Sequence, residues 1–337
     1  MIKVGIIGAT GYGGRELIRL LGLHPEAGLV KVTSTSAAGQ PLGAVLPAFD
    51  GLTDLSLEPF EPAVLAQECD VVCIGVPGTE SMPLAAALRE AGARVIDIGP
   101  DFRLKDPESF KQYYGVDHAA PQYLESAVYG LPAFYRRQLE SASLVAVPGC
   151  YPIGAILPLR PVLEDVNPQV PVIIDAISGI SGAGRSTSEA LHFPEMNENV
   201  WAYKVGRHQH IPEIEQELCH PTPIQFTPHV GPYTRGILST ITFRPEAEVD
   251  LNACYAAYEA EPFIRLRGEG VLPELKHVRG TNFCDIGWVN DTRTGNIIIV
   301  SAIDNLMGGT AGMAIQCMNL MFGIEETAGL GFGGMSV

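Results

Sequence analysis

A glycine-rich turn near the N-terminus constrains the fold of this chain more than any other feature. Residues 2–7 are mostly apolar and β-branched, which predicts a buried strand, and the segment GATGYGG at 8–14 follows directly. Apolar positions within 16–21, ELIRLL, then recur at helical spacing. A strand, a tight glycine turn and a helix in this order are typical of a dinucleotide-binding domain, in which the pyrophosphate lies against the helix N-terminus.

The residues after the second predicted strand favour NADP over NAD. An acidic side chain about twenty positions beyond the glycines would bind the ribose 2′-hydroxyl of NAD. This chain instead has Thr33, Ser34, Thr35 and Ser36, with no acid before Asp50. Hydroxyls can accommodate a 2′-phosphate, and no carboxylate repels it. The same four residues could equally be the exposed end of a strand.

The rest of the chain divides into two parts that differ in their pattern of predicted helices and strands. Up to residue 149, helical stretches alternate with short apolar runs that begin at 70, 94 and 143, which predicts a parallel sheet covered on both faces. Beyond Cys150, longer strand candidates begin at 170, 235 and 296 with fewer helices between them. The sequence therefore predicts an α/β protein: a Rossmann-type domain followed by an α+β domain with a mixed or antiparallel sheet.

Composition excludes several classes of function. The formal net charge is −16, from 22 Lys and Arg against 38 Asp and Glu, so we expect no binding to nucleic acid or to a membrane surface. Residues 305–324 contain no charged side chain and are long enough to span a bilayer, but they include four Gly together with Asn, Gln and Thr, which favours a buried helix over a membrane span. The seven cysteines form no CxxC pair and the N-terminus lacks a signal-peptide core, so we expect reduced thiols and a cytoplasmic location.

Cys150 occupies a distinctive position among the cysteines. It follows an apolar strand that ends at Gly149, and Pro152 suits the first turn of a helix. A thiol at a helix N-terminus meets unpaired N–H groups that favour the thiolate, and the same groups could hold an oxyanion. A buried, inert thiol is the commoner role of a cysteine, and the other six lie within helical or strand runs.

His208 and His210 stand two residues apart, just before Pro212 and Glu213. A residue before proline is held extended, so both imidazoles can point to the same side. A nucleophilic cysteine needs an acid–base partner, which favours a catalytic role, whereas a surface or capping role is the alternative. A zinc site lacks a third ligand at useful spacing, and we expect no metal.

Two arginines are candidates for binding anions. Arg103 follows the end of a predicted parallel strand, where ligands bind in such sheets, although a salt bridge to Asp101 or Asp106 is equally compatible. Arg185 lies in a glycine- and serine-rich loop that could approach a ligand or simply be a flexible surface loop.

The motifs GATGYGG, PGCYP, SGISGAGR, RHQHIPEI and DNLMGGTAG occur in this order over nearly the whole chain. Together they resemble the N-acetyl-gamma-glutamyl-phosphate reductases of arginine biosynthesis, which are related to aspartate-semialdehyde dehydrogenase. The resemblance implies an NADP-binding domain of residues 1–149 plus about 308–337, completed by a returning C-terminal helix. It also implies a catalytic, substrate-binding and dimerisation domain of residues 150–307.

The resemblance also implies a role for individual residues. Cys150 would be the nucleophile and His208 the acid–base residue. Substrate contacts would come from Arg103, Arg185, His210 and Glu213. The cofactor site would be lined by Gly8, Thr10, Gly11, Tyr12, Gly13, Gly14, Ser34, Thr35, Gly182 and Asn305. The expected reaction is NADPH-dependent reduction of a small acyl phosphate through a cysteine thioester, in a homo-oligomer such as a dimer or tetramer.

Other functions remain open at this point. The same chemistry could act on a carrier-linked aminoadipyl phosphate or on aspartyl phosphate, although an acidic carrier would be repelled by a chain of net charge −16. A non-catalytic NADP-binding sensor would not need Cys150. A short-chain reductase or epimerase would need a Tyr-xxx-Lys pair, and none of the eleven tyrosines has Lys four positions on.

Overall fold

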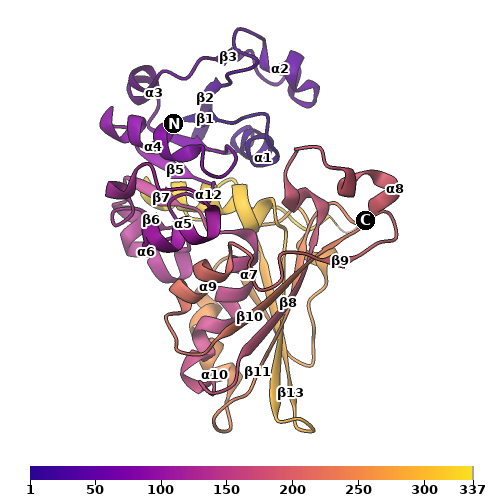
Figure 1. Cartoon of the computed structure of the whole chain (residues 1–337). Coiled ribbons are helices and arrows are strands. Elements are labelled where there is room, and N and C mark those ends of the chain that lie inside the picture. The colour runs from indigo at the N-terminus through magenta and orange to yellow at the C-terminus, as the bar shows by residue number, and fades with distance from the viewer. Residues whose placement is uncertain (336–337) are drawn as a thin grey trace. The chain divides into compact units, whose positions relative to one another are not determined.

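The computed structural model describes residues 1–335 and divides the chain into two compact units (Figure 1). Unit 1 comprises Met1–Pro148 and Thr310–Gly331, and unit 2 comprises Gly149–Gly309 together with the tail from Phe332. None of the helices formed by the described residues is long and apolar enough to cross a bilayer.

Unit 1 is built on a seven-stranded sheet whose strands pair in parallel, in the order β3-β2-β1-β4-β5-β7-β6. The strands are β1 (Ile2–Ile7), β2 (Ala27–Thr33), β3 (Leu57–Glu58), β4 (Val71–Ile74), β5 (Val95–Asp97), β6 (Val128–Tyr129) and β7 (Leu144–Ala146). The α-helices are α1 (Tyr12–Leu21), α2 (Leu42–Val45), α3 (Pro62–Glu68), α4 (Ser81–Glu90), α5 (Pro107–Tyr114), α6 (Pro132–Glu140) and α12 (Gly312–Met321). Short 3₁₀ turns lie at Pro47–Phe49 and Pro121–Tyr123.

The central strands of unit 1 explain why its sequence reads as continuous apolar runs. Every residue of β4, β5 and β7 is buried, as expected for strands covered on both faces. The final helix α12 packs in this unit against α1 and α6, where the Asn319 side chain lies 3.0 Å from the His24 ring. A π-helical turn at Met307–Ala311 leads into it.

Unit 2 contains a mixed seven-stranded sheet in the order β12-β13-β14-β11-β8-β10-β9. Its strands are β8 (Val172–Gly179), β9 (Trp201–Ala202), β10 (Ile224–Gly231), β11 (Ile237–Phe243), β12 (Ile264–Glu269), β13 (Cys284–Asp291) and β14 (Asn296–Ile303). Its α-helices are α7 (Cys150–Leu159), α8 (Phe193–Met196), α9 (Ile211–Leu218), α10 (Leu251–Tyr255) and α11 (Leu275–Val278). Short 3₁₀ turns lie at Arg160–Asp165, Ile180–Ala183, Glu189–Leu191 and Ala256–Ala260.

Some strands of unit 2 alternate in burial, unlike the central strands of unit 1. Buried and partly exposed residues alternate along β11, and the first half of β8 alternates in the same way. Such alternation indicates a sheet covered on one face. Helix α7 packs on β11 and β14, and Figure 1 places α7, α9 and α10 on the same side of the long strands. Helix α7, which begins with Cys150, therefore packs on one face of this sheet.

The strands expected from sequence are present, with shifted ends. The second strand runs from Ala27 to Thr33, so Ser34 directly follows it. The runs that begin at 70, 94 and 143 form β4, β5 and β7, each of which starts one residue later. The parallel and mixed sheets confirm the predicted fold class.

Candidate active site

Cys150 is the first residue of α7, at the strand-to-helix turn that the sequence predicts. The preceding Gly149 has an extended backbone (φ −66°, ψ 148°) and no side chain that could cap the helix. The first turn of α7 also contains no acidic residue. Because the leading N–H groups of a helix lack partners within it, this position favours an anionic group such as a thiolate.

Burial separates Cys150 from the core cysteines. Removal from water raises the pKa of Cys69 to about 11 and that of Cys73 to about 12, and it also raises the pKa of the buried Cys284 and Cys317. These thiols stay protonated and unreactive at neutral pH. Cys150 is half-buried and does not belong to this group of core thiols.

The backbone at Gly309 passes directly against Cys150. A Cβ atom built on Gly309 would lie 2.9 Å from the Cβ of Cys150, closer than two carbon atoms normally approach. Any other residue here would push on the Cys150 side chain. The glycine therefore fits close approach of two segments that are far apart in sequence.

Glu213 connects the thiol turn to the histidine segment. Its side chain is 1% exposed, and its Oε1 accepts a hydrogen bond of 2.7 Å from the backbone N–H of Gly149. Glu213 lies in the first turn of α9, directly after His208 and His210. One carboxylate thus fixes the start of α7 to the start of α9, a role that sequence reasoning did not assign to it.

His208 is buried in an aromatic environment. It is 2% exposed, and its ring contacts Tyr151, Tyr203, His210 and Phe226 with centroid distances of 5.7, 5.5, 4.7 and 5.3 Å. Burial, with a smaller contribution from the Lys204 charge, lowers the pKa of His208 to about 4. The ring is therefore neutral at physiological pH.

A backbone hydrogen bond sets the tautomer of His208. The N–H of His210 donates to Nδ1 of His208 over 3.1 Å, so Nδ1 must be unprotonated. The proton of the neutral ring consequently sits on Nε2. In this state His208 can donate a hydrogen bond or a proton from Nε2 but cannot accept one there.

Two tyrosines that sequence reasoning passed over complete this cluster. Tyr203 donates from its hydroxyl to the Tyr151 hydroxyl (3.3 Å), and Tyr151 donates to the carbonyl of His229 (2.9 Å). Burial, together with the nearby Cys150 charge, raises the pKa of Tyr203 to about 12. The sequence signal for Tyr151 was its place directly after Cys150. No local pattern in the sequence points to Tyr203.

The two candidate arginines have very different surroundings. Arg103, in unit 1, is 7% exposed and donates from Nε to the carbonyl of Val147 (2.8 Å) and from Nη2 to that of Ile98 (3.1 Å). Arg185, in unit 2, lies in an exposed loop after the 3₁₀ turn at Ile180–Ala183. Arg103 thus joins the carboxyl ends of β5 and β7, and anion binding by either arginine stays a prediction.

Gly182 and Asn305, expected at the cofactor, lie next to each other in unit 2. The Asn305 side chain accepts from the N–H of Gly236 (2.7 Å) and donates to Oγ of Ser181 (2.9 Å). A Cβ on Gly182 would lie 2.8 Å from Oγ of Ser178 and 3.9 Å from Nδ2 of Asn305. Asn305 therefore ties the loop at 181–182 to the start of β11.

The glycine turn of unit 1 meets the requirements of a phosphate-binding loop. Gly8 has a φ of +83°, and a Cβ there would lie 2.3 Å from the carbonyl oxygen of Gly75. A Cβ on Gly14 would lie 2.4 Å from the carbonyl oxygen of Gly8, so helix and turn pack closely. A Cβ on Gly11 would meet its nearest neighbour at 3.4 Å, which leaves the helix N-terminus open to a ligand.

The remaining residues expected at the nucleotide lie around this turn. Tyr12 begins α1, and the carbonyl of Thr10 accepts from Nε of Arg15 (3.0 Å). A Cβ on Gly13 would lie 2.9 Å from the Ile98 side chain. The N-terminus of α1 thus has no side-chain cap and no acid in its first turn, which suits the binding of a dinucleotide pyrophosphate.

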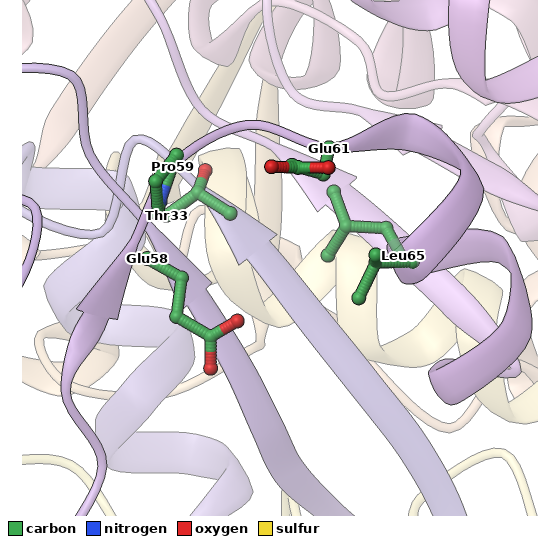
Figure 2. Close-up of a pocket in the computed structure, with 6 residues that line it drawn as sticks. Thr33, Glu58, Pro59, Glu61 and Leu65 are labelled. Atoms are coloured by element: carbon green, nitrogen blue, oxygen red, sulfur yellow. The ribbon is translucent and has the colours of Figure 1, made fainter.

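The end of β2 carries acids that the local sequence did not reveal. Oγ of Ser34 accepts from the N–H of Ala37 (3.2 Å), and Thr35 is exposed. Beside them, Thr33, Glu58 and Glu61 contribute to a pocket of about 180 Å³ (Figure 2). Lys31 lies between two carboxylates: its Nζ is 2.8 and 2.9 Å from the oxygens of Glu58 and 3.0 Å from Oε2 of Glu68, so its single positive charge is shared between them.

Within residues 1–335, no group of three or more His, Cys, Asp and Glu side chains is arranged to hold a metal ion. The groups described above are instead suited to nucleophilic chemistry: a thiol at a helix N-terminus, and near it an aromatic pocket holding a neutral imidazole.

Comparison with known proteins assigns this arrangement to a family. Residues 3–142 match the model of the semialdehyde dehydrogenase NAD-binding domain, and residues 150–305 match that of the semialdehyde dehydrogenase dimerisation domain. An N-acetyl-gamma-glutamyl-phosphate reductase of Citrifermentans bemidjiense is 47% identical, with 98% of each chain covered. One from Symbiobacterium thermophilum is 48% identical over 98% of this chain and 97% of its own. The chain belongs to the N-acetyl-gamma-glutamyl-phosphate reductase family.

Solved structures place this reductase-family chain in the same fold as aspartate-semialdehyde dehydrogenases. The enzyme of Vibrio cholerae, solved with ASA, has a TM-score of 0.73 at 17% identity and covers 96% of this chain and 98% of its own. The enzyme of Candida albicans, solved with NADP, has a TM-score of 0.73 at 16% identity and covers 96% and 99%. At these identities the likeness establishes the fold alone.

Proposed function

We propose that this chain is an NADPH-dependent N-acetyl-gamma-glutamyl-phosphate reductase that works through a thioester on Cys150. The observation that carries the proposal is Cys150 at the open N-terminus of α7, in a chain close to half identical to reductases of that name. An aspartyl-phosphate substrate has support from the fold alone, and neither a carrier-linked substrate nor a non-catalytic sensor is favoured by any relative described above.

The first step forms the thioester. The Cys150 thiolate attacks the acyl carbonyl, a carbon–sulfur bond forms, and the carbon–oxygen bond to the departing phosphate breaks. The leading N–H groups of α7 are placed to stabilise the oxyanion of the tetrahedral intermediate. Arg103 and Arg185 are proposed to bind substrate anions, together with His210. Glu213 is proposed as a nearby active-site group that acts through Gly149.

The second step reduces the thioester to the aldehyde. When bound, NADPH would supply the hydride to the carbonyl carbon of the thioester. The residues proposed to hold it are Gly8, Thr10, Gly11, Tyr12, Gly13 and Gly14, with Ser34, Thr35, Gly182 and Asn305 as further proposed contacts. His208 donates a hydrogen bond from Nε2 to the oxyanion of the thiohemiacetal; the carbonyl then re-forms, the carbon–sulfur bond breaks, and Cys150 leaves as the thiolate. The buried aromatic surroundings of His208 exclude water from this proton.

The oligomeric state and location complete the proposal. The match of residues 150–305 to a dimerisation domain supports a homo-oligomer, and we propose a dimer or tetramer. We also propose a cytoplasmic location, because a catalytic thiolate needs a reducing compartment.

The test is the reverse reaction with purified protein. We expect phosphate-dependent reduction of NADP with free N-acetylglutamate semialdehyde, and no reduction by the Cys150→Ser variant. Activity with a carrier-linked aminoadipate semialdehyde or with aspartate semialdehyde, but not with the free acetylated substrate, would overturn the assignment.

A further inference from the structure

Unit 1 contains a buried cluster of two carboxyls and one hydroxyl. Asp97 ends β5, Asp101 lies in the following loop, and Ser81 begins α4. All three side chains are 0% exposed. Oγ of Ser81 lies 2.8 Å from Oδ2 of Asp101 and 2.9 Å from Oδ2 of Asp97, so a single hydroxyl stands between two carboxyls.

A count of hydrogens shows that this cluster needs one more proton. The Ser81 hydroxyl has one hydrogen and can donate to one carboxyl. If both carboxyls were ionised, the other contact would bring two oxygen lone pairs together at a fully buried site, which is strongly unfavourable. One of the two carboxyls must therefore carry a proton and donate it to Oγ of Ser81.

The backbone partners decide which carboxyl is protonated. Asp101 also accepts from the N–H groups of Thr79 (2.7 Å) and Ser81 (3.0 Å), so both of its oxygens receive backbone donors. Asp97 accepts from one backbone donor, the N–H of Gly99 on Oδ1 (2.9 Å), and its Oδ2 faces Ser81. Three donors stabilise the carboxylate of Asp101, and the proton falls to Oδ2 of Asp97.

We propose that Asp97 is a protonated positioning residue, whose acid O–H donates to Ser81 while Ser81 donates to Asp101, and that this chain of bonds holds the loop between β4 and α4 in place for the dinucleotide. The proposal rests on the proposed function for its cofactor. It assigns Asp97 no contact with substrate or cofactor.

The loop held by Asp101 lies where a dinucleotide is expected. Strands β1 and β4 are neighbours at the point where the strand order of the sheet reverses, and ligands bind at the carboxyl ends of such strands. The carbonyl of Gly75, directly after β4, packs against Gly8 of the glycine turn. Thr79, four residues on, has a φ of +74°, a strained value for a β-branched residue, and its N–H is anchored on Asp101.

The charges around Asp97 are consistent with this protonation state. Burial and the Asp101 carboxylate raise the pKa of Asp97 from 3.8 to about 7, against the Gly99 and Ser81 hydrogen bonds and the more distant Arg103 charge. His118 lies 2.8 Å from the carbonyl of Asp101, and burial lowers its pKa, so it adds no positive charge at neutral pH. Above the pKa of Asp97 the proton leaves and the hydroxyl faces two carboxylates.

Infrared spectroscopy of the full chain tests the protonation directly. The difference spectrum of wild type minus Asp97→Asn, without cofactor at pH 6, should contain the carbonyl band of a protonated carboxylic acid, and this band should fade as the pH is raised. Exposed Asp54→Asn is the matched control and should leave the band unchanged. Absence of the band in wild type would overturn the proposal, whether or not the chain binds NADPH.

Binding of NADPH, followed by its fluorescence, tests the positioning role. Asn at 97 can donate to Ser81 and accept from Gly99 as the protonated acid does, so Asp97→Asn should keep the affinity and lose its decline with rising pH. Asp101→Asn places an amide against three donors and should weaken binding about tenfold or more. Equal damage by the two variants, or an unchanged pH dependence in Asp97→Asn, would overturn the proposal.

Ser81→Ala serves as a second variant if Asp101→Asn does not fold. It removes the acceptor of the Asp97 proton and should move the acid carbonyl band to higher frequency. A band that stays at the wild-type position in Ser81→Ala would contradict the proposed hydrogen bond.

Discussion

Two helices of this chain follow a glycine at the end of a strand-to-helix turn. The backbone N–H of each glycine needs a hydrogen-bond acceptor, and the two find it in different places. Gly11 precedes α1 and Gly149 precedes α7; both are extended, and neither helix has an acid in its first turn. The N–H of Gly11 donates to the carbonyl of Gly8, three residues away (3.1 Å). The N–H of Gly149 donates instead to the Glu213 carboxylate on another helix. The N–H of the glycine before α1 therefore finds its acceptor within its own motif, whereas the N–H of the glycine before α7 depends on a distant segment.

This difference matches the chemistry proposed for each turn. An anion held by α1 needs open backbone N–H groups and close packing of glycines, and these are local properties. A covalent nucleophile at α7 needs its partner groups at a fixed distance, because small displacements are costly in catalysis. Glu213 follows His208 and His210 by a few residues, so its bond to Gly149 fixes both segments together.

The largest effect should come from changing the first residue of α7. We expect Cys150→Ser to lower turnover about a thousandfold or more while leaving the fold and NADPH binding intact, because a hydroxyl is far harder to ionise than a thiol. The measurement is the NADPH oxidation rate beside a binding titration. Cys219→Ser, at an exposed cysteine, is the control and should be fully active; wild-type turnover in Cys150→Ser would exclude covalent catalysis through this residue.

The histidine segment should show the next largest effect. We expect His208→Asn to lower kcat about a hundredfold, and more than His210→Asn does, because His208 holds its proton on Nε2 in a buried site. Equal losses, or a larger loss at His210, would reverse the assignment.

The pH dependence of stability sharpens this assignment. The pKa of His208 is about 4 in the folded protein against an ordinary value of 6.5. Between these two pH values the imidazole is therefore protonated in the unfolded chain but neutral in the folded one. His208 should therefore cost the folded protein stability as the pH falls from 6.5 toward 4, and His208→Asn should remove that part of the decline in Tm. A variant with the full wild-type decline would contradict a buried, neutral ring.

At the first turn, what matters is that Gly8 has no side chain. We expect Gly8→Ala to destabilise unit 1 by about 2–3 kcal/mol and to abolish NADPH binding, because it combines a φ of +83° with a contact of 2.3 Å to Gly75. Gly39→Ala is the matched control, with a φ of +85° and nothing within 4 Å. Urea unfolding separates the two: equal destabilisation would show that backbone strain, not the approach to Gly75, makes glycine necessary.

Much of the first turn and little of the second could be predicted from sequence. The glycine spacing, the apolar strand and the helical period are local signals, and they predicted the parallel sheet and the phosphate-binding turn. Cys150 was found because Gly149 and Pro152 mark a helix start. The bonds from Glu213 to Gly149 and from Tyr203 to Tyr151 join segments that no local pattern links.

The same reason explains what sequence reasoning missed in unit 1. Asp97 reads as part of an apolar strand, and Ser81 as the start of a helix. Their shared proton depends on the neighbouring ends of β4 and β5, which follow from sheet order and not from spacing. Glu58 and Glu61 likewise lie beside the end of β2 because β3 is the neighbour of β2 in the sheet.

Cofactor choice tests how far the first turn is self-contained. We expect NADPH to be preferred to NADH by at least about tenfold, because the hydroxyl residues Ser34 and Thr35, and no acid, directly follow β2. Ser34→Asp should shift the preference toward NADH, as measured by kcat/KM with each cofactor. A wild-type preference for NADH would mean that the acids of the pocket in Figure 2, brought from another strand, bind the ribose.

The smallest effect should separate the charge of Glu213 from its position. Glu213→Gln keeps an oxygen that can accept from Gly149, and a neutral acceptor is weaker than a charged one by about 1 kcal/mol, so we expect kcat within about threefold of wild type. Glu213→Ala leaves the buried N–H of Gly149 without its acceptor, which costs about 1–3 kcal/mol, and it frees the start of α7 from α9. We therefore expect Glu213→Ala to lower kcat far more than Glu213→Gln, while KM for NADPH stays the same. Glu248→Gln, at an exposed glutamate of unit 2, is the control for charge alone. If Glu213→Gln were as impaired as Glu213→Ala, the carboxylate charge itself would act in the reaction, and the two turns would differ in chemistry rather than in the origin of one hydrogen bond.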